Sequence, residues 1–143
     1  MGSPCKDLTT AAGPLRILVV EDNAETAATL ATLLDLAGHE VRVAHDGPAA
    51  LEGVQAFPLD VVLLDIGLPG MNGWQVVERL RQQPAHQRPL VIALTGYGQD
   101  ADRRRSQEAG IALHLLKPVD AADLLGLLSR FQRLLGQQAA PSC

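Results

Sequence analysis

The sequence predicts an α/β domain in which a doubly wound parallel sheet of five strands is covered by five helices. Five short apolar runs alternate with five helical patterns, and the connections between them are short. Most of the apolar runs are continuous, as expected of parallel strands that are buried on both faces. The chain has 143 residues and 47% hydrophobic content, which is the size of one such domain. We expect the strand order 2-1-3-4-5.

The first half of the chain contains two strand–helix units and the third strand. In order, we expect a strand at 16–20, a helix at 23–38, a strand at 40–47, a helix at 48–57 and a strand at 60–65. The first and third strands each contain a continuous apolar run of four residues, at 17–20 and 61–64, whereas the second alternates and is typical of an edge strand. Apolar residues recur at three- and four-residue steps in the first helix, which Gly38 ends. Pro48 suits the first turn of the second helix.

The second half continues the alternation. In order, we expect a helix at 74–83, a strand at 89–96, a helix at 100–110, a strand at 111–118 and a helix at 120–135. Pro84 ends the third helix, and Gly110 ends the fourth. The final helix is amphipathic and closes the domain.

Composition limits the domain organisation and the partners. We expect flexible tails at 1–14 and 136–143 around one domain at 15–135; Cys5 and Cys143 lie in these tails and are expected to be reduced thiols. The net charge of −4 argues against binding of nucleic acid. No apolar run approaches the about 20 residues that span a bilayer, so we expect no membrane insertion and a cytoplasmic location.

Acidic residues follow two neighbouring strands of the expected sheet. Glu21 and Asp22 follow the first strand, and Asp65 ends the third. The order 2-1-3-4-5 reverses direction between these strands, and ligands of such sheets bind beyond the carboxyl ends at that point. Two unit charges about 4 Å apart interact by about 4 kcal/mol at an effective dielectric constant of 20, so three acids need a cation. Oxygen ligands favour Mg²⁺ ahead of Mn²⁺ or Ca²⁺.

The last two strands offer groups that complement a phosphoryl group. Thr95 and Gly96 lie at the end of the fourth strand and offer a hydroxyl and an open backbone N–H, and Lys117 lies at the end of the fifth strand and offers a cation. A carboxylate can attack an activated phosphorus when a metal and a lysine neutralise the phosphoryl oxygens. Asp65 is therefore the candidate nucleophile.

Four stretches at the strand ends resemble one family. "VVEDN", "LLDIGLPGMNG", "ALTGYG" and "LLKPVD" together resemble the receiver domain of two-component response regulators, the CheY-like family with a flavodoxin-like sheet, over residues 15–135. The resemblance implies that Asp65 is the phosphoacceptor, that Lys117 pairs with the phosphoryl oxygens, and that Thr95 and Gly96 contact them. It also implies a Mg²⁺ site whose ligands are Asp22, Asp65, the backbone carbonyl of Gly67 and, through water, Glu21.

The resemblance further implies a role in signalling. A histidine kinase or a histidine phosphotransfer protein would donate the phosphoryl group, and an effector protein would respond. Such a domain catalyses only its own phosphorylation and dephosphorylation, so it is not classed as an enzyme. It could be a stand-alone protein or the receiver of a hybrid histidine kinase.

Residues of the fourth and fifth strands bear on the switch and on the orientation of the lysine. Thr95 and His114 occupy the switch positions of the family, where His114 replaces the more usual Tyr or Phe. The Lys117–Pro118 peptide bond is expected to be cis, as in the family, which would aim the lysine at the site.

Three other functions compete with this interpretation of the residues. A phosphohydrolase with an aspartate nucleophile would need a second Asp at position 67, which is Gly, and a dinucleotide binder would need a Gly-rich turn in place of "EDNAET". A receiver-like interaction module that is not phosphorylated stays open as the alternative. His39, His45 and His86 are expected at the surface.

Overall fold

The computed structural model describes residues 14–56, 58–65, 73–82, 89–95, 111, 113–117 and 119–139. In chain order, these residues form β1 (Arg16–Val20), α2 (Ala24–Leu36), β2 (Glu40–Ala44), α3 (Gly47–Ala56), β3 (Val61–Asp65), α4 (Gly73–Arg81), β4 (Leu90–Thr95), β5 (Leu113–Leu116) and α6 (Ala121–Ala139). All five expected strands and four of the five expected helices are present among them, and α6 continues past its expected end at 135. The helix expected at 100–110 lies outside the described residues.

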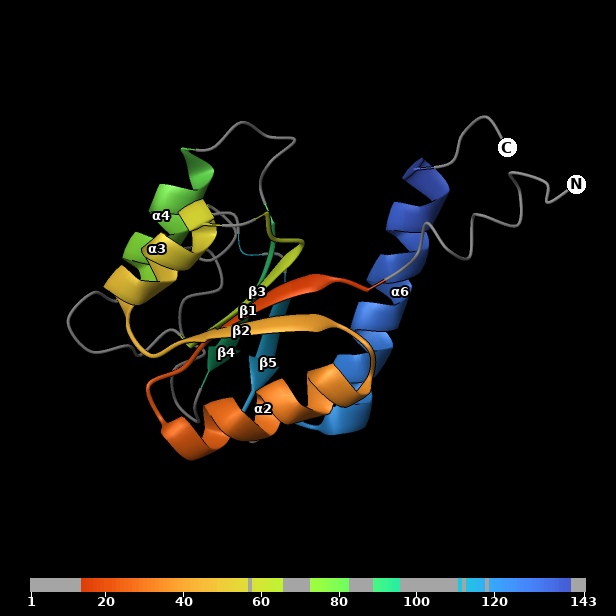
Figure 1. Cartoon of the computed structure of the whole chain (residues 1–143), viewed down its shortest axis with the longest axis horizontal. Coiled ribbons are helices and arrows are strands. Elements are labelled where there is room, and N and C mark those ends of the chain that lie inside the picture. The colour runs from red at the N-terminus through yellow and green to blue at the C-terminus, as the bar shows by residue number, and fades with distance from the viewer. Residues whose placement is uncertain are drawn as a thin grey trace, which may run out of the picture.

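The five strands form one parallel sheet in the order β2-β1-β3-β4-β5 (Figure 1), which confirms the expected order. Because every strand runs in the same direction, the carboxyl ends of all five lie along one edge of the sheet. Val20 of β1 pairs with Leu64 of β3, so Glu21 follows β1 at the level of Asp65. The register of the sheet therefore brings the acids of the two strands together.

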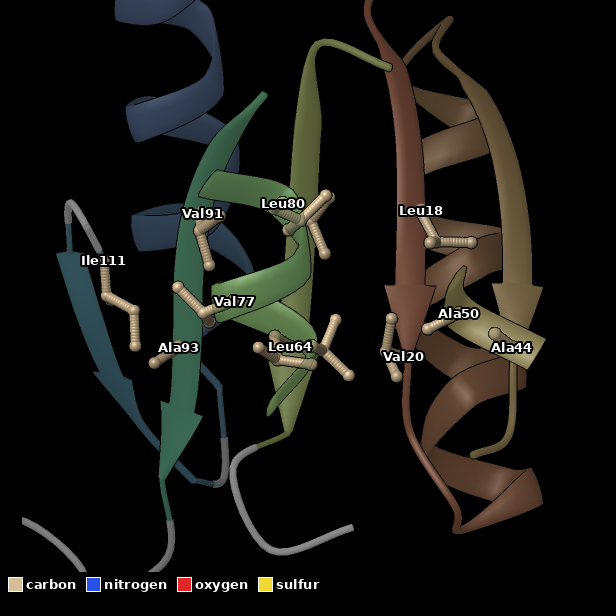
Figure 2. Packing of buried hydrophobic residues seen from close by; sticks show 12 residues of the cluster. Leu18, Val20, Ala44, Ala50, Leu64, Val77, Leu80, Val91, Ala93 and Ile111 are labelled. Atoms are coloured by element: carbon tan, nitrogen blue, oxygen red, sulfur yellow. The ribbon is translucent and has the colours of Figure 1, made fainter. Parts of the chain in front are cut away.

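Helices cover both faces of the sheet. In the sequence of β1, Leu18 and Val20 face one apolar cluster, and Ile17 and Val19 face the other. The first cluster is completed by residues of α3 and α4, as Figure 2 shows for Ala50, Val77 and Leu80. The second is completed by residues of α2 and α6, namely Leu30, Leu34, Leu124 and Leu128. Every residue of β3 is buried, which explains why this strand is apolar on both faces up to Asp65.

Local signals fix the two ends of α2. The Asn23 side chain accepts a hydrogen bond from the Thr26 N–H at 2.9 Å and caps the start of the helix, one residue after Asp22. Gly38 follows the helix with a φ of 96°, a conformation that glycine adopts without steric penalty. The cap sets the start of α2, so Glu21 and Asp22 occupy the two positions between the end of β1 and the capping residue.

His39 is buried, so the expectation that it lies at the surface is wrong. Its side chain accepts a hydrogen bond at Nδ1 from the Leu15 N–H at 3.1 Å, and only 6% of the residue is exposed. Burial lowers the pKa of His39, because it penalises the charged imidazolium. His45 is exposed, as expected, and His86 lies outside the described residues.

None of the described helices has the length and apolar composition needed to cross a membrane.

We predict that His39 makes the protein less stable in mildly acidic solution. The unfolded chain protonates His39 near its ordinary pKa of about 6.5, whereas the folded chain does so only at lower pH. The stability that neutral His39 contributes is therefore complete above about pH 6.5 and is lost as the pH falls toward the folded pKa. Urea unfolding measures this stability. Between neutral and mildly acidic pH, the free energy of unfolding should fall less in His39→Asn than in the wild type, because Asn keeps an acceptor but does not titrate.

The same substitution at His45 is the control for this experiment, because it removes an exposed histidine and leaves the buried contact between His39 and the Leu15 backbone intact. Equal pH dependence in the wild type and in His39→Asn would contradict the prediction.

Candidate functional site

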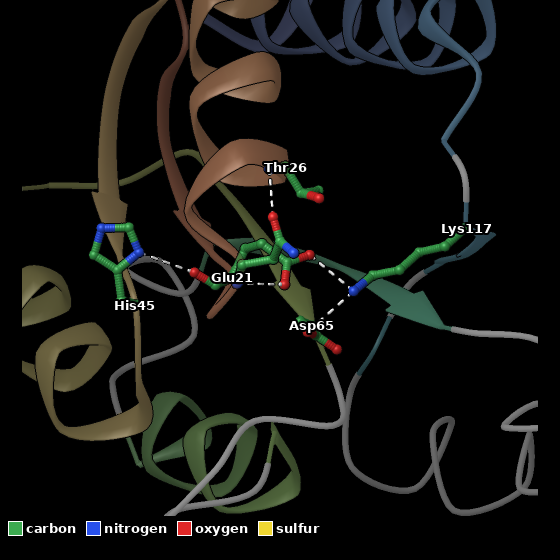
Figure 3. A network of polar contacts seen from close by, with 6 residues as sticks. Glu21, Thr26, His45, Asp65 and Lys117 are labelled. Carbon is green, nitrogen blue, oxygen red and sulfur yellow. Dashed lines mark hydrogen bonds and ion pairs between the residues drawn. The ribbon is translucent and has the colours of Figure 1, made fainter.

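The candidate site lies at the carboxyl ends of β1, β3 and β5 (Figure 3). Glu21 and Asp22 directly follow β1, Asp65 is the last residue of β3, and Lys117 directly follows β5. These residues are far apart in the sequence, and the parallel sheet brings them to one edge. The structure thus brings these four residues to one place.

Lys117 bridges two buried carboxylates. Its Nζ lies 2.8 Å from Oε1 of Glu21 and 3.0 Å from Oδ2 of Asp65. The side chains of Glu21 and Asp65 are only 1% and 7% exposed, whereas that of Lys117 is 28% exposed. Buried carboxylates are tolerated when they are paired and hydrogen-bonded, so this ammonium group is what permits two acids at the buried strand ends.

The pKa shifts at the site reflect burial and pairing together. Burial is the largest influence on Glu21 and raises its pKa; the hydrogen bond from Lys117 acts against this, and the neighbouring Asp65 raises the pKa again. Burial acts to lower the pKa of Lys117, but its hydrogen bonds to Glu21 and Asp65 outweigh it and the pKa is raised. Lys117 is therefore firmly protonated at neutral pH.

The donor set suits a hard divalent cation. Glu21, Asp22 and Asp65 each offer a carboxylate oxygen, and these atoms lie within 4.8 Å of one another. When all three are ionised, their charge exceeds that of the Lys117 ammonium by two. Asp22 is exposed, which gives the cluster access to solvent. Clustered carboxylate oxygens that retain contact with water are the ligands preferred by Mg²⁺, so the residues present fit this ion.

Backbone contacts hold Glu21 from several directions. Its N–H donates to the Ala44 carbonyl at 3.0 Å, and its Oε2 accepts from the Asn23 N–H at 3.2 Å. Its carbonyl oxygen lies 3.1 Å from Nδ1 of His45, which follows β2. Sequence reasoning missed the contact of Glu21 with His45. The one available signal was the position of each residue directly after a strand.

The other predicted site residues are only partly described. Thr95 ends β4, and its Cα pairs with that of Leu116, directly before Lys117. His114 is half-buried on β5, where its Cα pairs with that of Ala93. The Thr95 side chain, Gly67, Gly96 and Pro118 lie outside the described residues, so the expected cis peptide bond at Pro118 stays a prediction.

Comparison with known proteins identifies a family match. Residues 17–129 match the family model described as response regulator receiver domain. The chain is similar to the sensor histidine kinase GacS of Pseudomonas protegens, with 32% identity over 129 residues, covering 88% of this chain and 14% of that protein. It is also similar to the transcriptional regulatory protein CpxR of Klebsiella pneumoniae, with 38% identity over 118 residues, covering 82% of this chain and 49% of that protein.

Solved structures agree with this match. The receiver domain of a sensor histidine kinase of Pseudomonas aeruginosa PAO1 was solved with a magnesium ion coordinated in its active site cleft. The present structure is similar to it with a TM-score of 0.74 and 30% identity, covering 84% of this chain and 98% of that one. The chain thus spans a whole solved receiver domain, but only one seventh to one half of the curated relatives described above.

We predict that Lys117→Met destabilises the fold at neutral pH and that acid reverses much of the loss. The substitution leaves Glu21 and Asp65 buried without their cation, which should lower the free energy of unfolding by about 2 kcal/mol. Because the pKa of Glu21 is already raised, its carboxyl should take up a proton as the pH falls, and this would relieve the repulsion. Urea unfolding at neutral and acidic pH measures both effects.

Arg133→Met removes an exposed cation of α6 and is the matched control, expected to change stability little. If the gap between Lys117→Met and the wild type stayed constant as the pH falls, the electrostatic explanation would be wrong.

Proposed function

The chain belongs to the response regulator receiver domain family, and from this premise we propose that Asp65 accepts a phosphoryl group from a phosphohistidine of a partner protein. Receiver domains are the phosphoacceptor domains of two-component signalling. The observation that carries the assignment to Asp65 is its surroundings, because the Lys117 ammonium lies 3.0 Å from Oδ2 and two further acids lie beside it. This arrangement combines a carboxylate nucleophile with cationic stabilisation of a phosphoryl group.

The proposed reaction is a direct displacement at phosphorus. An Asp65 carboxylate oxygen attacks the phosphorus as the bond to the imidazole nitrogen breaks, and an acyl phosphate forms. The other ring nitrogen of the phosphohistidine carries a proton, so the histidine leaves as a neutral imidazole. Lys117 then pairs with the phosphoryl oxygens. Its raised pKa supports this role, since the group stays charged throughout the neutral range. Mg²⁺, when bound, would neutralise further charge on those oxygens.

The chain supplies a ligand set for this ion. Asp22, Asp65 and the backbone carbonyl of Gly67 would hold Mg²⁺ directly. Glu21 would act through water, because its two carboxylate oxygens already contact Lys117 and the Asn23 amide. The exposed position of Asp22 supports its role as the ligand that an incoming hydrated ion meets first.

Residues after β4 and on β5 would recognise the phosphorylated state. We assign contacts with the phosphoryl oxygens to the Thr95 hydroxyl and the Gly96 amide, since β4 lies between the strands that end at Asp65 and before Lys117. Thr95 and half-buried His114 would form the switch, with an imidazole in place of the usual aromatic ring.

The partners are proposed from the relatives. A histidine kinase or a histidine phosphotransfer protein would supply the phosphoryl group in the cytoplasm, and a protein effector would respond, because the relatives include a sensor kinase and a transcriptional regulatory protein. A receiver-like interaction module that takes no phosphate is the second candidate, but the presence of the acids and the lysine in one cluster favours phosphorylation.

We predict that Asp65→Asn abolishes labelling by a small-molecule phosphodonor in the presence of Mg²⁺. The amide has nearly the same shape as the carboxylate but is not nucleophilic at neutral pH. Phosphate incorporation measured by intact mass, with circular dichroism to check the fold, tests this. Labelling of the variant at the wild-type level would remove Asp65 from its role, whereas a wild type that neither labels nor traps beryllofluoride would support the interaction module.

We also predict that Asp22→Ala raises the dissociation constant for Mg²⁺ at least ~10-fold, because it removes a direct ligand that Glu21 cannot replace. Isothermal titration calorimetry measures the constant, and fluorescence of Trp74, the single tryptophan, offers a second signal. Glu25→Ala, which removes a nearby exposed acid in the first turn of α2, is the control and should bind Mg²⁺ almost as the wild type does. An unchanged constant in Asp22→Ala would refute the assignment.

A further inference from the structure

We propose that His45 is a positioning residue that orients Asp22 through a hydrogen bond to the backbone of Glu21. The consequence for Mg²⁺ rests on the proposed function of the acidic cluster, whereas the hydrogen bond itself is a property of the protein without metal. His45 directly follows β2, and its Nδ1 lies 3.1 Å from the Glu21 carbonyl oxygen (Figure 3).

The chemistry of this contact determines that one particular ring nitrogen of His45 carries a proton. A backbone carbonyl can only accept a hydrogen bond, so Nδ1 of His45 must carry the proton. Both the neutral Nδ1–H tautomer and the imidazolium meet this requirement.

The carbonyl that His45 contacts belongs to the peptide plane between Glu21 and Asp22. This unit is rigid, so a hydrogen bond that holds the Glu21 carbonyl also fixes the direction of the Asp22 N–H and Cα. The N–H of Glu21 is held by the Ala44 carbonyl at 3.0 Å, and the N–H of Asn23 is held by Oε2 of Glu21 at 3.2 Å. The contact with His45 thus restrains the peptide plane that lies between these two anchors.

Asp22 depends on its backbone more than its two neighbours in the cluster do. Glu21 and Asp65 are buried and paired with Lys117, but Asp22 is exposed. An exposed side chain is surrounded by fewer packed neighbours than a buried one, so its carboxylate has less support from packing. The orientation of its peptide plane therefore determines where this carboxylate lies relative to the other two.

His45 is itself held in place on both sides. Ala44 pairs with Val20 of β1, which fixes the chain before His45. Asp46 caps α3 directly after it, because its Oδ1 accepts from the Ala49 N–H at 2.8 Å and its carbonyl accepts from the Ala50 N–H at 3.0 Å. The exposed His45 ring contributes little to the core, and its hydrogen bond links this capped turn to the acidic cluster.

A pair of His45 variants and a neighbouring control test the proposal. His45→Ala removes the donor, and His45→Asn offers an amide N–H near the place of Nδ1. The control Val43→Ala truncates a partly exposed side chain of β2, the strand that His45 follows. His45→Ala should raise the dissociation constant for Mg²⁺ about 2- to 10-fold, the range that corresponds to one ordinary hydrogen bond. His45→Asn should recover most of the wild-type affinity, and Val43→Ala should keep it.

The rate of labelling by a small-molecule phosphodonor separates positioning from a general loss of structure. In His45→Ala the rate should fall at limiting Mg²⁺ and return to near the wild-type rate at saturating Mg²⁺. An unchanged Mg²⁺ affinity in His45→Ala would overturn the proposal. So would an equal loss of affinity in His45→Asn and His45→Ala accompanied by an equal loss of stability, because this indicates a structural role.

Nuclear magnetic resonance of the metal-free wild type keeps the two hypotheses distinguishable. Nitrogen spectra at a pH where His45 is neutral should show the Nδ1–H tautomer, and the Asp22 amide signal should shift in His45→Ala and return toward its wild-type position in His45→Asn. A dominant Nε2–H tautomer would overturn the positioning contact. If the tautomer is as expected but the wild type does not bind Mg²⁺, the proposed metal function fails while the contact stands.

Discussion

The bridge from Lys117 to Glu21 and Asp65 is the interaction on which the site depends. Removing a carboxylate from water costs several kcal/mol, and two carboxylates side by side would add their mutual repulsion. An ammonium group 2.8 Å from one and 3.0 Å from the other offsets both terms, because it pairs with two buried oxygens at once. The acids can therefore lie at strand ends that are otherwise fully apolar.

This constraint explains why a parallel sheet suits the site. The acids come from β1 and β3, and the lysine follows β5 at the far edge of the sheet, so all three strands must end along the same edge. The central strand β3 is buried on both faces and held by neighbours on both sides, which gives Asp65 a rigid support. The core would preorganise Asp65 for the role of nucleophile that we propose, so little further ordering would be needed when a phosphoryl group arrives.

The excess negative charge of the site lowers its stability, and the same charge would attract the divalent cation of the proposed function. One ammonium does not neutralise three carboxylates, and the excess negative charge is what a divalent cation would relieve. Glu21 shows the cost of this arrangement, since burial raises its pKa even with Lys117 bound. Perturbed ionisation of this kind is common where burial and charge have been arranged for chemistry, and here it coincides with the match to a family of phosphoacceptor domains.

Sequence alone determined the order of strands and helices and most of the acidic site. Continuous apolar runs mark buried strands, and Glu21, Asp22, Asp65 and Lys117 could be placed together because the carboxyl ends of parallel strands must meet at one edge. Only the tertiary structure revealed that His39 is buried against the Leu15 backbone and that His45 contacts the Glu21 carbonyl. These are contacts between residues 24 or more positions apart, and each depends on register and rotamer. Local periodicity reports which face of an element is apolar, but it contains no information about which distant polar atom a side chain will reach.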